Sequence, residues 1–195
     1  MGANLTKIFV VDIEATCWRT PEEQGDLPNE VIEIGICELR TKSREIVNKR
    51  SFVVRPEVTR VNEFCTELTG WTQDQIDAQG KPIADVLLDI EREMGTSRHH
   101  VWCSFGEYDR VKLSSDPYEK GGLYSLYGIE RARNPFAYMR AHYNIKTLMA
   151  FKERLPKELG MARALQFYGL ELLGRHHNGA DDAFNIARIA DRVLS

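Results

Sequence analysis

The feature that most constrains this chain is an apolar, β-branched segment from Ile8 to Thr16, which carries the two carboxylates Asp12 and Glu14. A segment of this composition favours a strand that is buried on both faces. Side chains alternate along a strand, so the two acids lie on the same side, about 7 Å apart. Two like charges in a buried strand resist joint ionisation, and a divalent cation relieves that repulsion. The alternative is that the strand ends at Val11 and that both acids face water.

Length and composition predict one globular domain, residues 1–195, with a substantial core. The residues are 43% hydrophobic and 28% charged, as in ordinary soluble proteins. No apolar run approaches the ~20 residues that span a bilayer, and the N-terminus lacks a secretory pattern. The four cysteines form no CxxC pair, so we expect reduced thiols in a cytoplasmic protein without a membrane part.

The charges are unevenly distributed along the chain. The net charge of −3 argues against bulk electrostatic binding of nucleic acid. However, residues 12–33 hold seven acids and one arginine, whereas residues 131–163 hold eight lysines and arginines and two acids. An acidic centre beside a basic surface suits a metal site that acts on a polyanion, with two unrelated solvated surfaces as the alternative.

Hydrophobic periodicity predicts strands followed by alternating strands and helices. We expect strands over residues 7–15, 30–39, 45–55 and 100–105, and helices over 62–68, 82–94, 108–113, 145–155, 158–168 and 179–194. The segment 117–135 is expected to be mostly a long surface connection. The first three strands have hairpin-length connections, which indicates an antiparallel meander. The pattern predicts a mixed sheet covered by helices, in an α/β or α+β arrangement.

Two more acids can complete a metal site with the first pair. Asp109 follows the fourth predicted strand, where open sheets place functional groups, although Glu107 competes with it. By itself, Asp109 could instead be a carboxylate that complements the dipole of the following helix.

Asp182 lies on the apolar face of the last predicted helix, whereas Asp181 is rotated by about 100° toward Arg188 and Arg192. An acid on an apolar face needs a partner, either a metal or the backbone at the helix start. The other members of that face are Ile186, Ile189, Ala190 and Val193.

Two adjacent histidines, His176 and His177, precede the last helix. A histidine beside carboxylates can act as a general base near neutral pH, because its ordinary pKa is about 6.5. Either residue could instead be an ordinary surface histidine.

Read together, these pieces resemble the three motifs of the DEDDh 3′–5′ exonucleases, whose ribonuclease H-like fold is the mixed sheet expected above. The motifs are Asp12-Ile13-Glu14, Tyr108-Asp109 and His177-Asn178-Gly179-Ala180-Asp181-Asp182. The closer resemblance is to the ERI-1-like branch, which trims RNA 3′ ends. It covers residues 11–18, 63–70, 144–146 and 174–189.

The resemblance implies roles for the acids and for one histidine. Asp12, Glu14, Asp109 and Asp182 would hold two Mg²⁺ ions, with Mn²⁺ able to substitute. The family places its base five residues before its last metal-binding Asp. The pair His177 and Asp182 fits that spacing, as does the pair His176 and Asp181, and the surrounding motif selects the former. Relatives often have Pro where this chain has His176.

The resemblance also implies where the terminal nucleotide binds. Phe64, Leu68 and Tyr108 would contact its base and sugar, together with the backbone at Ala15 and Thr16. Ordinary core packing is the alternative for Phe64 and Leu68.

The implied function is a 3′–5′ exoribonuclease that uses two metal ions and a histidine base. It would release nucleoside 5′-monophosphates from single-stranded or overhanging RNA 3′ ends. Two alternatives remain open: a DNA 3′–5′ exonuclease for repair or proofreading, and a nucleic-acid-binding adaptor without catalysis. The sequence identifies no protein partner.

Overall fold

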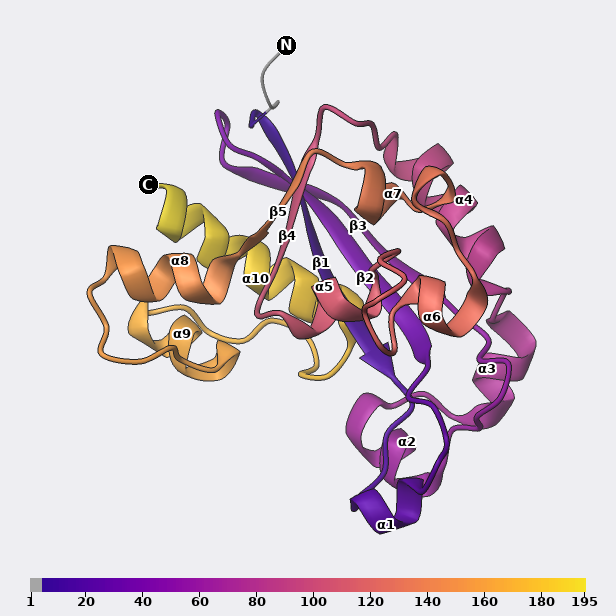
Figure 1. Cartoon of the computed structure of the whole chain (residues 1–195). Coiled ribbons are helices and arrows are strands. Elements are labelled where there is room, and N and C mark those ends of the chain that lie inside the picture. Colours follow the sequence, from indigo (N-terminus) through magenta and orange to yellow (C-terminus); the bar gives the residue numbers. More distant parts are fainter. Residues whose placement is uncertain (1–4) are drawn as a thin grey trace.

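The computed structural model describes residues 5–195, so residues 1–4 of the predicted domain lie outside the described part. A five-stranded mixed sheet, in the order β3-β2-β1-β4-β5, forms the centre (Figure 1). β1 pairs antiparallel with β2 and parallel with β4, which confirms the predicted meander followed by parallel strands. The strands are β1 (Lys7–Ala15), β2 (Val31–Arg40), β3 (Glu45–Val53), β4 (Val101–Ser104) and β5 (Ala141–Asn144).

Helices cover both faces of the sheet and extend beyond the end of β1 (Figure 1). One face is covered by α8 (Ile145–Lys152), α9 (Met161–Phe167) and α10 (Gly179–Leu194). The other is covered by α4 (Ile83–Met94), α6 (Leu123–Tyr127) and α7 (Pro135–Tyr138). The short helix η1 (Arg131–Arg133) lies between α6 and α7 in the chain. The remaining helices are α1 (Pro21–Gln24), α2 (Glu63–Thr69), α3 (Gln73–Gln79) and α5 (Tyr108–Lys112).

The alternation of β1 divides its side chains between two cores. Phe9, Val11 and Ile13 pack with α4 and α7, whereas Ile8 and Val10 face the layer of α8, α9 and α10. Side chains alternate along a strand, so Asp12 and Glu14 continue the row of Ile8 and Val10. The two acids therefore emerge on the side of the sheet that α10 covers.

The start of α10 is held tightly against β2. The carboxylate of Glu33, which is fully buried, accepts hydrogen bonds from the Gly179 N–H (3.0 Å) and the Ala180 N–H (3.3 Å). A Cβ atom on Gly35 would lie 1.9 Å from the Gly179 carbonyl carbon, so only glycine permits this approach. Because Gly35 is the register partner of Asp12, this contact brings the first turn of α10 next to the acids of β1.

Several features differ from the expected elements. β5 was not predicted, because its four residues show no apolar alternation and pair only with β4. The segment 117–135 contains α6 and η1, and it buries Leu123 and Ile129 in the core, so the expectation of a mere surface connection was wrong there. A short helix, α1, lies between β1 and β2, where no helix was among the expected elements. Among residues 5–195, no helix is both long and apolar enough to cross a membrane.

Candidate active site

Three carboxylates meet where the end of β1 faces the start of α10. Asp12 is half-buried, and Glu14 and Asp182 are only 8% and 3% exposed. Each of the three offers an oxygen within 4.8 Å of the others, as the sequence predicted for acids that share a metal. The strand therefore does not end at Val11, since β1 continues to Ala15.

Asp109 joins these acids from the side of β4. Its Oδ1 accepts a hydrogen bond from the Ile13 N–H, between the two acids of β1, at 3.0 Å. Asp109 is 5% exposed and lies outside the group of three that shares the 4.8 Å limit. Glu107, the competing acid, is exposed and binds Arg110 Nε (2.6 Å) and Asn144 Nδ2 (3.2 Å) instead.

Burial raises the pKa values of three of these acids, and the charges of neighbouring acids add to the effect for Asp12 and Glu14. Burial, followed by the charges of Asp109, Glu14 and Asp182, raises the pKa of Asp12 well above its usual range. Burial and the nearby charge of Glu33 raise the pKa of Glu14 to about 8. Burial also raises the pKa of Asp109 to about 6, although hydrogen bonds from Ile13 and Ser104 oppose it.

Asp182 has one carboxylate oxygen bound and one free. Its Oδ2 accepts a hydrogen bond from the His177 backbone N–H and lies 2.9 Å from His176 Nδ1. Its Oδ1 is buried and has no hydrogen-bond partner among the described residues. Hydrogen bonding to the backbone at the helix start, the expected alternative to a metal, thus accounts for only one of the two carboxylate oxygens of Asp182. A free buried carboxylate oxygen beside other acids fits a divalent cation with hard oxygen ligands.

The two histidines stack at the entrance to this cluster. Their ring centroids lie 4.0 Å apart with an interplanar angle of 14°. His177 adopts a left-handed backbone conformation (φ 62°), which turns its N–H toward Asp182. Its imidazole makes no hydrogen bond in the described part of the chain. Burial and the neighbouring His176 lower the pKa of His177, so its ring is neutral at pH 7 and can accept a proton.

Asp181 faces away from the cluster, as its rotation on the helix predicts. Its partners differ from those expected, however. It forms an ion pair with Lys49 and accepts a hydrogen bond from the Arg175 N–H, rather than approaching Arg188 and Arg192. Arg188 instead donates to the Glu171 carbonyl oxygen, at 2.6 Å.

The residues expected to contact the terminal nucleotide border the acids on two sides. Phe64 and Leu68, on α2, are half-buried rather than full members of the core. The Phe64 ring lines a cavity of about 320 Å³ and lies under the Arg19 guanidinium. Tyr108 is 51% exposed, and its hydroxyl donates to Asn29 Oδ1 at 2.6 Å.

Ala15 and Thr16 lie at the end of β1, next to Glu14. The Thr16 side chain is fully buried: its hydroxyl oxygen accepts from the Glu30 N–H at 2.9 Å. The Ala15 carbonyl oxygen accepts from the Cys65 thiol of α2. These bonds fix the backbone between the acids and α2, where a terminal nucleotide would lie.

A family model described as Exonuclease (RNase_T) matches residues 9–190. The chain belongs to this exonuclease family. Mouse (Mus musculus) 3'-5' exoribonuclease 1 is 32% identical to it, over 96% of this chain and 52% of that protein. ERI1 exoribonuclease 2 of Xenopus laevis is 28% identical, over 96% of this chain and 28% of that protein. The chain thus spans about half the length of the first of these relatives.

A solved structure confirms the ribonuclease H-like exonuclease fold. The nuclease domain of 3'hExo, described as a DEDDh family member bound to rAMP, has a TM-score of 0.81 and 30% identity, over 100% of this chain and 94% of that one. A second structure, of a 3'-exonuclease that recognises the histone mRNA stem-loop, has a TM-score of 0.80 and 29% identity. It matches 97% of this chain and 81% of that one.

Two residues that position these acids and histidines were not singled out from the sequence. Glu33 anchors α10, and its place as an acid inside an apolar strand was a signal for it. Arg175 donates from Nη2 to the carbonyl oxygens of Glu67 (3.1 Å) and Leu68 (3.4 Å). It thereby connects the segment that carries His176 and His177 to α2, and no local sequence pattern predicts this contact.

Proposed function

We propose that this chain is a metal-dependent 3′–5′ exoribonuclease that removes nucleoside 5′-monophosphates from single-stranded or overhanging RNA 3′ ends. The observation that carries the proposal is the free, buried Oδ1 of Asp182 within a cluster of acids. Membership of the exonuclease family and relatives named as exoribonucleases support the reaction. The rAMP in the 3'hExo structure supports RNA as the polymer.

Four carboxylates would hold the metal: Asp12, Glu14, Asp109 and Asp182. Their oxygens are the ligands that Mg²⁺ prefers, and Mn²⁺ would substitute for it. When bound, two such ions activate a water and stabilise the leaving 3′ oxygen. The protein's own part is to hold these acids close together in a buried site, and burial together with the neighbouring charges raises the pKa of Glu14.

His177 would take the proton from the attacking water. Its ring has no hydrogen-bond partner in the described chain, whereas Nδ1 of His176 lies 2.9 Å from Asp182 Oδ2. His177 is also neutral at pH 7, because burial lowers its pKa. A general base contributes about 10²- to 10⁴-fold to a rate, so this assignment is open to measurement.

The terminal nucleotide would lie between α2 and α5. Phe64 and Leu68 offer half-buried apolar surfaces, and Tyr108 offers an exposed ring. Stacking on such side chains tolerates any base, so we expect hydrolysis with little sequence preference. We further propose that the chain acts as one exonuclease domain in the cytoplasm.

The proposal is tested by incubating 5′-labelled RNA with the protein and Mg²⁺. Wild type is expected to shorten the RNA from its 3′ end, and Asp12→Ala is expected to lose at least about a hundredfold in rate, because metal ions contribute several kcal/mol. Asp26→Ala, which removes an exposed acid, is the matched control and should retain the wild-type rate. A matched DNA strand tests the alternative polymer through its missing 2′-hydroxyl. Shortening that survives Asp12→Ala would refute the mechanism.

A further inference from the structure

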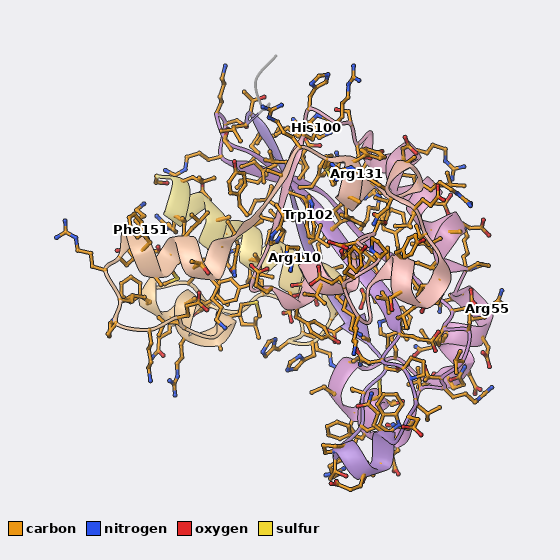
Figure 2. All side chains as sticks on the ribbon, viewed as in Figure 1. Arg55, His100, Trp102, Arg110, Arg131 and Phe151 are labelled. Carbon is orange, nitrogen blue, oxygen red and sulfur yellow. The ribbon has the colours of Figure 1, made fainter. Side chains whose placement is uncertain are left out.

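A second cavity lies on the face of the sheet opposite the acid cluster. Its volume is about 560 Å³, within the range of ligand sites. Trp102 and His142, from β4 and β5, line it together with three arginines: Arg110, Arg131 and Arg140. In Figure 2, Arg110 and Arg131 lie to either side of Trp102. No candidate residue of the exonuclease site lines this cavity.

Two of the three arginines carry unmatched charge. Arg110 is paired with Glu107 (2.6 Å) and Glu119 (2.9 Å). Arg131 and Arg140 are exposed and make no side-chain hydrogen bond or ion pair with any described residue. Asp116 is the one acid among the lining residues, so arginines are in excess over acids in the cavity wall, although Glu107 and Glu119 offset the charge of Arg110. Such an excess on exposed guanidinium groups favours phosphate, which arginine binds in a bidentate manner.

An aromatic ring lies at the same cavity. Tyr118 is 91% exposed, which is unusual for a side chain of this size. Its backbone N–H donates to Asp116 Oδ1 at 2.9 Å, which fixes the turn that presents the ring. Unpaired cations beside an exposed ring are the combination that binds single-stranded nucleic acid without reading its sequence.

The cavity and the acid cluster are close neighbours across the end of β4. Arg110 lines the cavity, and the preceding residue of α5, Asp109, belongs to the cluster. The Ser104 hydroxyl lies 2.9 Å from Nε2 of His142, in the cavity wall, and donates to the carbonyl oxygen of Gly106 (2.9 Å), in the turn that leads to Asp109. A strand whose 3′ end lies at the acids therefore reaches the cavity within a few nucleotides.

We infer that this cavity binds the phosphodiester backbone of the substrate strand, a few nucleotides upstream of the 3′ end. Arg131 and Arg140 contact the phosphates, and Tyr118 stacks on a base. This inference rests on the proposed exonuclease function, which it extends from the terminal nucleotide to the strand behind it. The site makes long strands better substrates than short ones, irrespective of their sequence.

The test compares wild type with the double variant Arg131→Ala/Arg140→Ala. The matched control is Arg133→Ala, because Arg133 is an exposed arginine of the same short helix that does not line the cavity. The probes are labelled RNAs of about four and about twelve nucleotides, spanning the usual range of single-strand sites. Binding is measured by fluorescence anisotropy in EDTA over a range of salt concentrations, and hydrolysis is measured with Mg²⁺. Thermal melting verifies that each variant is folded.

We expect the double variant to bind the long RNA about tenfold more weakly, with the slope of log K against log salt reduced by about 1.4. Its kcat/KM for the long RNA should fall toward that for the short one. Arg133→Ala should retain both the affinity and the slope. Tyr118→Ala should weaken long-strand binding with the slope unchanged, because a ring carries no charge.

Three results would overturn the inference: wild-type binding of the long RNA by the double variant, an equal loss on the short RNA, or an equal loss in Arg133→Ala. An equal loss in the control would show that only net charge matters. Absence of hydrolysis in wild type would refute the proposed function instead. The anisotropy measurement would still report on the cavity, so the two failures are distinguishable.

Discussion

Glu30 and the acids of the cluster are all buried carboxylates, but they differ in what surrounds them. Glu30, which is 1% exposed, accepts hydrogen bonds from the backbone N–H groups of residues 57–59, from the Thr59 hydroxyl and from the Tyr127 hydroxyl. Burial opposes its ionisation, but these donors outweigh burial and keep its pKa below the ordinary value. Glu14 is similarly buried, but it faces other acids, and its pKa rises to about 8.

The difference separates an acid whose charge the fold itself stabilises from acids whose charge a cation would stabilise. Hydrogen-bond donors stabilise the charge of Glu30 within the fold, so it needs nothing more. Asp12, Glu14 and Asp182 form a cluster with too few donors, and one oxygen of Asp182 has none among the described residues. The protein tolerates that repulsion at one place, which is the place where a cation would relieve it.

The largest expected effect on folding comes from Glu30. Glu30→Gln should lower the free energy of unfolding by about 3 kcal/mol, because several buried donors lose a charged acceptor and meet an amide N–H₂ group. Urea denaturation in EDTA measures the change. The remaining folded enzyme should retain its activity, since Glu30 does not touch the acid cluster. A Glu30→Gln variant as stable as wild type would show that the surrounding hydrogen-bond donors do not stabilise the charge of Glu30.

Replacing His177 should affect the reaction and not the fold. We expect His177→Ala to lower kcat at least about a hundredfold, equivalent to about 2.7 kcal/mol, through loss of the proton acceptor. His176→Ala is the control from the same stacked pair, and its loss should be smaller, because His176 only orients Asp182. Single-turnover hydrolysis of labelled RNA measures both rates. A larger loss of kcat in His176→Ala than in His177→Ala would assign the general base to His176.

A smaller effect is expected on the pH dependence of stability. The folded pKa of Glu14, about 8, lies above its ordinary value of 4.5. The folded state therefore holds a proton that the unfolded state releases, and stability falls as the pH rises from about 4.5 to 8. In EDTA, the free energy of unfolding of Glu14→Gln should fall by about 1–2 kcal/mol less than that of wild type between these two pH values. Denaturation curves at both pH values measure this difference. Equal losses of stability in the variant and in wild type would mean that the fold does not raise the pKa of Glu14.

Local patterns were sufficient to predict much of this site. β1 and α10 follow from hydrophobic periodicity, and the apolar face of α10 selects Asp182 over Asp181, which the structure bears out in burial. Such patterns depend only on residues within one helix or strand, so they can be recognised from the sequence. Asp109 was a candidate because it follows the fourth predicted strand, and the Ile13 N–H holds it beside the acids.

Contacts between distant segments could not be predicted in the same way. The anchoring of α10 by Glu33 depends on the close approach of Gly35 and Gly179, which are far apart in the chain. β5 is too short to show periodicity, and it exists because β4 offers it an edge. The arginine-lined cavity likewise joins residues from α5, η1 and β4 that carry no shared motif.

The central claim is that Asp182 and its neighbouring acids bind divalent metal, and titration calorimetry with Mg²⁺ tests it most directly. Wild type should bind the ion, and Asp182→Asn should lose most of that binding. Asp181→Asn, which alters the adjacent acid on the solvent side, should bind as wild type does. Undiminished Mg²⁺ binding by Asp182→Asn, or an equal loss in both variants, would contradict the account.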